Sequence, residues 1–109
     1  MSILDSRKVD FIGIEVGSND VILTISDHLD WKNSEFHLEK LQNKINNYIK
    51  FYESGQIYED YPNAKGKNII IALTLAEPLN EEGTDFCVEA KQILNGMGLD
   101  LRIEVIKIK

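Results

Sequence analysis

The chain has 109 residues, 43% of them hydrophobic and 28% charged, which is the balance of one soluble globular domain. Its formal net charge of −6, with no stripe of basic residues, disfavours nucleic-acid binding because phosphate backbones repel an acidic surface. A single cysteine excludes an intramolecular disulfide and fits a reducing compartment. No apolar run approaches the roughly 20 residues that cross a bilayer.

These properties predict a cytoplasmic protein that binds neither nucleic acid nor a membrane. We expect one domain over residues 1–109, in which residues 1–8 could form a disordered N-terminal segment. Neither a P-loop nor a Cys/His zinc spacing is present, so the favoured interpretation of the sequence includes no cofactor and no metal site.

Two apolar segments near the N-terminus alternate with the period of a β-strand. Residues 9–16 place Ile12, Ile14 and Val16 on one side, and residues 21–26 repeat this alternation. The intervening residues 17–20, Gly-Ser-Asn-Asp, have the composition of a tight turn. The two segments are therefore predicted to form a β-hairpin.

A helix is predicted from about residue 34 to residue 53. Its apolar residues recur at three- and four-residue steps and are Leu38, Leu41, Ile45, Tyr48, Ile49 and Tyr52. Asn33 or Ser34 can cap the start by accepting a free backbone N–H, and Gly55 suits the end. On this pattern Lys44 belongs to the polar face, and His37 is predicted to be a surface residue.

The second half of the chain continues with a loop, a strand, a helix and a strand. The loop covers residues 56–67, and the almost unbroken apolar run at residues 68–75 is typical of a central strand covered on both faces. The helix is predicted over about 80–95 and the last strand over 101–108. Cys87 lies near the apolar stripe of this helix and is expected to be packed and unreactive.

The order ββαβαβ predicts an α+β fold: a two-layer sandwich with a mixed four-stranded sheet and two helices on one face. The opposite face of the sheet would carry Phe11, Ile22, Ile70, Ala72, Thr74, Arg102 and Glu104. Because an apolar patch of this kind is seldom left in water, we expect a homodimer to bury it through Phe11, Ile22 and Ile70. Alternatively, the long side chains of Arg102 and Glu104 cover it.

The clearest candidate for chemistry is the segment 26–31, Ser-Asp-His-Leu-Asp-Trp, at the end of the second strand. A histidine between two aspartates can serve as a general base or hold a divalent metal, so Asp27, His28 and Asp30 are candidate catalytic residues. Glu77 is added to them because it follows the third strand at the same edge of the predicted sheet. The structural interpretation is simpler. Aspartates are good turn and cap residues, and His28 then bonds only a backbone carbonyl.

Two tyrosines flank two acids at Tyr58, Glu59, Asp60 and Tyr61, in the loop predicted at the other end of the sheet. This composition is typical of protein-binding surfaces, and we place these residues, with Trp31, in a candidate partner-binding set. The alternative is that one tyrosine closes the end of the core with its hydroxyl group in water.

Several stretches resemble a family of small bacterial proteins that is classed as a domain of unknown function. The most specific are residues 23–31, Leu-Thr-Ile-Ser-Asp-His-Leu-Asp-Trp, and residues 53–58, Glu-Ser-Gly-Gln-Ile-Tyr. Weaker matches lie at residues 9–14 and 37–46. The resemblance implies a bacterial source and a single-domain unit, and it carries over no catalytic role.

Two hypotheses of function follow. The first is a small acidic interaction module, for example an immunity-type protein that occupies a basic toxin or effector. The second is a small enzyme or metal-dependent hydrolase that uses Asp27, His28 and Asp30, with Glu77 as a fourth member. The sequence favours the first, because it contains no convincing catalytic set.

Overall fold

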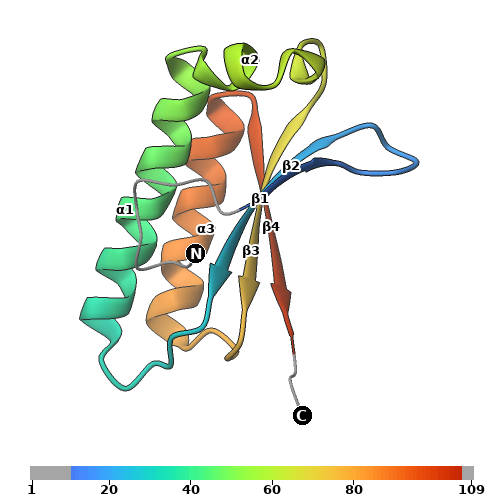
Figure 1. Cartoon of the computed structure of the whole chain (residues 1–109). Helices are drawn as coiled ribbons and strands as arrows, with labels where there is room; N and C mark the ends of the chain where they lie inside the picture. The colour runs from blue at the N-terminus through green and yellow to red at the C-terminus, as the bar shows by residue number, and fades with distance from the viewer. Residues whose placement is uncertain (1–10, 107–109) are drawn as a thin grey trace.

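The structure is a computed structural model that describes residues 11–106 (Figure 1). The strands are β1 (Phe11–Ile14), β2 (Val21–Asp27), β3 (Ile69–Leu75) and β4 (Leu99–Val105). The helices are α1 (Ser34–Glu53), α2 (Gln56–Asp60), the short 3-10 helix η1 (Pro62–Ala64) and α3 (Glu81–Gly96). Among these residues no helix has both the length and the apolar character needed to cross a bilayer.

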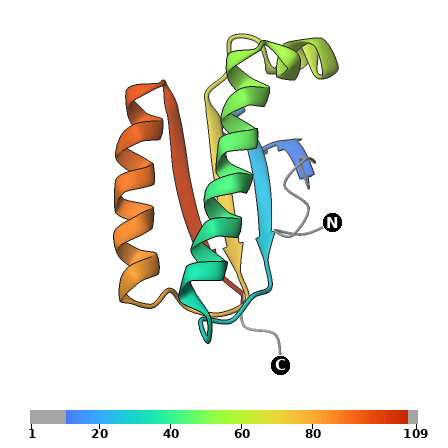
Figure 2. The same cartoon turned by 90° about the vertical axis from the view of Figure 1, so that its left-hand side faces the viewer.

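The sheet has the order β1-β2-β3-β4, so neighbours in sequence are neighbours in space. β1 and β2 form the predicted antiparallel hairpin, and β2, β3 and β4 run parallel through the two helical crossovers. Figures 1 and 2 show α1 and α3 together on one face of the sheet, where right-handed crossovers place them. The predicted two-layer α+β sandwich with a mixed four-stranded sheet is confirmed.

The core lies between the sheet and the two long helices. Alternate residues of β2 point toward the helices, and β3 is buried on both faces from Ile69 to Leu73, as expected for a central strand. Tyr48 of α1 is fully buried, and its hydroxyl donates to the Thr24 carbonyl at 2.7 Å. The prediction that Lys44 belongs to the polar face is wrong, because Lys44 is fully buried with its Nζ 5.7 Å from the centre of the Tyr48 ring.

The segment predicted as a loop over residues 56–67 contains α2 and η1. Gly55, at φ 81°, lets the chain leave α1 in a left-handed conformation. The chain then folds back so that Ile57 and Ala64 are buried against the end of the core. A five-residue helix is shorter than two turns, so its apolar spacing gives no periodic signal.

The ends of two strands also differ from the prediction. β1 stops at Ile14, and Val16 lies in the turn, where its side chain is 99% exposed. β4 begins at Leu99 and ends at Val105. Residues 1–10 and 107–109, which include the predicted disordered segment and the outer ends of two predicted strands, lie outside the described residues.

The sheet face opposite the helices is partly covered from within the chain. Arg102 of β4 donates to Glu15, at the end of the hairpin, with Nη1 2.7 Å from Oε2. Of the predicted dimer residues, Ile70 is 8% exposed and Ile22 is half-buried, while the side chain of Phe11 lies outside the described part. A homodimer through this face stays a prediction.

Candidate functional site

A buried aspartate–histidine pair joins the end of β2 to the first turn of α1. His37 Nε2 lies 2.5 Å from Asp27 Oδ2, and both side chains are at most 1% exposed. His37 Nδ1 lies 2.8 Å from the carbonyl oxygen of Asp30, and Asp27 Oδ1 accepts from the Leu29 backbone N–H at 3.0 Å. Every polar side-chain atom of the pair therefore has a partner within the protein.

The prediction that His37 is a surface residue is wrong. His37 lies four residues before Leu41, so it extends the buried stripe of α1 by one turn toward the N-terminus. Histidine is polar, so a stripe defined by apolar residues alone does not include it, although its side chain meets a buried aspartate from β2. The four-residue spacing between His37 and Leu41 is the sequence signal that indicates the buried position of His37.

Trp31 packs over this pair and connects it to the second long helix. Its ring stacks on His37, with centroids 3.7 Å apart and planes inclined by 22°. The far edge of the indole lies against Gly83 in the first turn of α3, where a Cβ atom would be 2.6 Å from Trp31 Cη2. Among the described residues the buried Nε1 of Trp31 has no hydrogen-bond partner.

The N-terminal caps of the two helices meet beside Trp31. Asn33 caps α1 by accepting from Phe36 N at 3.1 Å, as one of the two predicted alternatives. Asn80 caps α3 by accepting from Gly83 N at 2.8 Å, and its Nδ2 donates to Ser34 Oγ at 2.8 Å. Asn80 therefore caps α3 and is also hydrogen-bonded to the first residue of α1.

Cys87 is buried below this junction, as predicted. Burial and, to a smaller extent, the negative charge of Asp27 together raise the pKa of its thiol to about 11. At neutral pH the thiol is protonated, so it is a poor nucleophile.

The other predicted catalytic residues are not gathered around Asp27. His28 and Glu77 are exposed, and the Asp30 carboxylate accepts from the Lys32 backbone N–H at 3.0 Å. Within residues 11–106 no group of three or more His, Cys, Asp or Glu side chains could hold a metal ion. The polar side-chain atoms of Asp27 and His37 are all hydrogen-bonded within the protein. We therefore call this pair a clamp, because it links the end of β2 to the first turn of α1.

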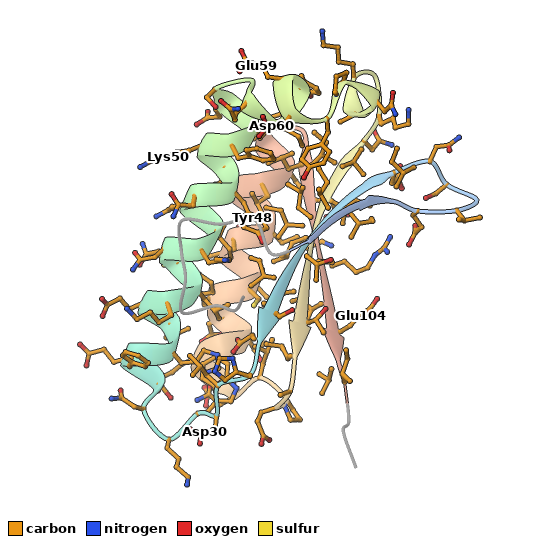
Figure 3. All side chains as sticks on the ribbon, in the orientation of Figure 1. Asp30, Tyr48, Lys50, Glu59, Asp60 and Glu104 are labelled. Atoms are coloured by element: carbon orange, nitrogen blue, oxygen red, sulfur yellow. The ribbon has the colours of Figure 1, made fainter. Side chains whose placement is uncertain are left out.

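The predicted partner-binding loop lies at the opposite end of the sheet, as Figure 3 shows for Glu59 and Asp60 relative to Asp30. Here a groove of about 460 Å³ separates the hairpin from the segment after α2. It is lined by Ile12, Gly13, Ile14, Val21, Asp60, Tyr61, Pro62, Asn63 and Ala64. Tyr61 is 45% exposed, whereas Tyr58 is half-buried against the core, the position that the alternative interpretation gives to one tyrosine.

Taken together, the fold and these two ends define a small α+β sandwich domain with a closed polar clamp at one end and an open apolar groove at the other. The chain belongs to a family of unknown function (DUF6572), whose model matches residues 1–107. Neither the curated proteins nor the solved structures contain a match to the chain.

Proposed function

We propose that the protein is an interaction module that binds a basic protein partner through the groove between the β1–β2 hairpin and residues 60–64. The observation that supports this proposal is the exposure of apolar side chains around the groove. Ile14 and Tyr61 are each 45% exposed on its two sides. The fold gains little from leaving them in water, whereas a partner side chain seated between them would cover both.

The groove has the size and chemistry of an anchor site. Its volume of about 460 Å³ falls in the range of roughly 300–1,000 Å³ that is typical of pockets enclosing a ligand. Tyrosine is enriched at such positions because its rigid ring offers a large contact area at a low entropic cost. A protruding apolar or aromatic side chain of the partner fits this chemistry.

Charge supports a basic partner. Glu59 and Asp60 are exposed beside the groove, and the chain carries a formal net charge of −6. Opposite charge accelerates association and limits the choice of partner. The positive charge of nearby Lys67 is engaged within the chain, because its Nζ donates to the Asn63 carbonyl at 2.8 Å.

A narrower form of the proposal is an immunity-type protein of bacterial origin that occupies a basic toxin or effector in the cytoplasm. The buried free Cys87 is consistent with a reducing compartment. The alternative, an enzyme that uses Asp27, His28 and Asp30, has no supporting observation, since Asp27 contacts His37 and His28 is exposed.

The test is a capture experiment with matched bait variants in lysate of the source organism. A partner captured by the wild-type protein should not be captured by the Tyr61→Ser variant. It should still be captured by the His28→Ala variant, which replaces an exposed residue at the other end of the sheet. With the purified partner, Glu59→Lys should weaken binding, and Lys65→Glu should leave it unchanged or strengthen it. Loss of the partner with His28→Ala but not with Tyr61→Ser would overturn the proposal.

A further inference from the structure

A second groove lies on the helical layer. Figure 2 shows α1 and α3 side by side over the sheet, diverging away from their N-terminal ends. Near these ends they are joined by the Asn80–Ser34 hydrogen bond and by Trp31, which packs on Gly83. Beyond this junction a groove of about 270 Å³ separates the two helices.

The groove has an apolar floor and an exposed apolar rim. Ile45 of α1 and Ala90 of α3, 4% and 8% exposed, form part of the floor, and the short side chain of Ala90 leaves room between the helices. Ile93 stands on the rim with 61% of its surface exposed, one turn from Ala90 and two turns from Phe86. An exposed isoleucine beside an apolar floor suits the docking of an apolar group.

An acidic stripe runs along the α3 side of this groove. It consists of Glu82, Asp85 and Glu89, which are exposed and spaced by three and four residues, so they lie on one face of the helix. Glu89 itself lines the groove. A complementary surface would pair an apolar stripe with neighbouring basic residues.

We propose that this groove binds an amphipathic helix of a partner protein. The apolar stripe of that helix packs on Phe86 and Ile93, and its Lys or Arg residues face the acidic stripe of α3. Residues 86–93 of α3 span about two helical turns, so about two to three turns of the partner are engaged. This surface is separate from the groove at Tyr61, and either proposal can fail without the other.

The probe is a fluorescein-labelled synthetic peptide of about 15 residues, built from Leu and Lys with the leucines at helical spacing. Its binding to the full chain is followed by fluorescence anisotropy. Ile93→Ser should lower the affinity about fivefold or more, because an apolar anchor is removed. Val88→Ser is the matched control. Val88 is a 55% exposed apolar residue of the same helix outside the groove, and its replacement should leave the affinity within about twofold.

Charge is tested separately. Glu89→Lys should weaken binding of the Leu/Lys peptide, and a Leu/Glu peptide with the same apolar pattern should bind far less well. Equal losses with Ile93→Ser and Val88→Ser, or equal affinities for the two peptides, would overturn the proposal. It would also be overturned if light scattering showed a dimer of the wild-type chain that Ile93→Ser dissociates, since the occupant would then be a second copy.

Discussion

Replacing Gly83 by alanine tests the packing at the junction of the two helices. In most helices Gly→Ala is stabilising by up to about 1 kcal/mol, because alanine loses less backbone entropy on folding. Here the new Cβ would lie 2.6 Å from Trp31 Cη2 and 2.9 Å from Cζ2. Since carbon atoms pack best at about 3.5–4.0 Å, the ring must move by about 1 Å.

The ring cannot move freely. It stacks at 3.7 Å on His37, which is fixed by contacts with Asp27 and with the Asp30 carbonyl. Overpacking of a fixed site costs about 1–3 kcal/mol. Because Gly83 is in the first turn of α3, the gain in helix propensity is smaller than in mid-helix, and we expect a net loss of about 1–2 kcal/mol in the free energy of unfolding.

Gly96 provides the matched control. It is also a helical glycine of α3, and apart from its chain neighbours and the backbone of its own helix no atom lies within 4 Å of its added Cβ. Urea denaturation should therefore show Gly83→Ala as less stable than the wild-type protein and Gly96→Ala as equally or more stable. In a Trp31→Leu background most of the cost of Gly83→Ala should disappear, and only the contact with Leu79 Cδ2 at 3.1 Å should remain. The reasoning is refuted if Gly83→Ala alone is as stable as Gly96→Ala.

Three further predictions concern two buried features, the Asp27–His37 pair and Cys87. His37→Ala should lower the free energy of unfolding by about 3 kcal/mol, because it leaves the buried Asp27 carboxyl without its main partner. Replacement of the exposed His28 by alanine should change this free energy by less than about 0.5 kcal/mol. Equal effects of the two substitutions in urea denaturation would contradict this prediction. Cys87 should react slowly with iodoacetamide at pH 8 in the native protein and quickly in denaturant. Because the pKa of Cys87 is raised in the fold to about 11, its contribution to stability is complete below the unfolded pKa near 8.5 and is lost as pH rises toward about 11. The stability of the wild-type protein should fall over that range relative to Cys87→Ala, and parallel curves would contradict the shift.

The fold was predictable because its signals are local and periodic. The alternation in β2, the almost unbroken apolar run of β3 and the stripes of α1 and α3 each persist over at least seven residues. α2 was not predictable in this way. Its one buried apolar residue, Ile57, matters only because the chain folds back over the end of the core.

The site was only partly predictable, because pairing between distant residues has no local signature. The sequence points to Asp27 as part of a polar cluster, but it suggests the adjacent His28 as partner. In a strand, neighbouring side chains point to opposite faces, so Asp27 at the end of β2 points toward the helical layer and the next residue does not share its direction. The imidazole that reaches Asp27 comes from α1, which the crossover returns to that face.

The buried clamp also explains why a polar pair can belong to the framework of a small domain. Apolar residues of similar volume could be at least as stabilising as Asp27 and His37, so stability alone does not account for the pair. Its hydrogen bonds have direction, however, and they fix where α1 begins and how Trp31 is oriented. Trp31 in turn sets the approach of α3 at Gly83, and from that junction the helices diverge to open the groove at Ile93. On this argument the polar end of the sheet determines the shape of the proposed helix-binding groove, which contains none of its residues.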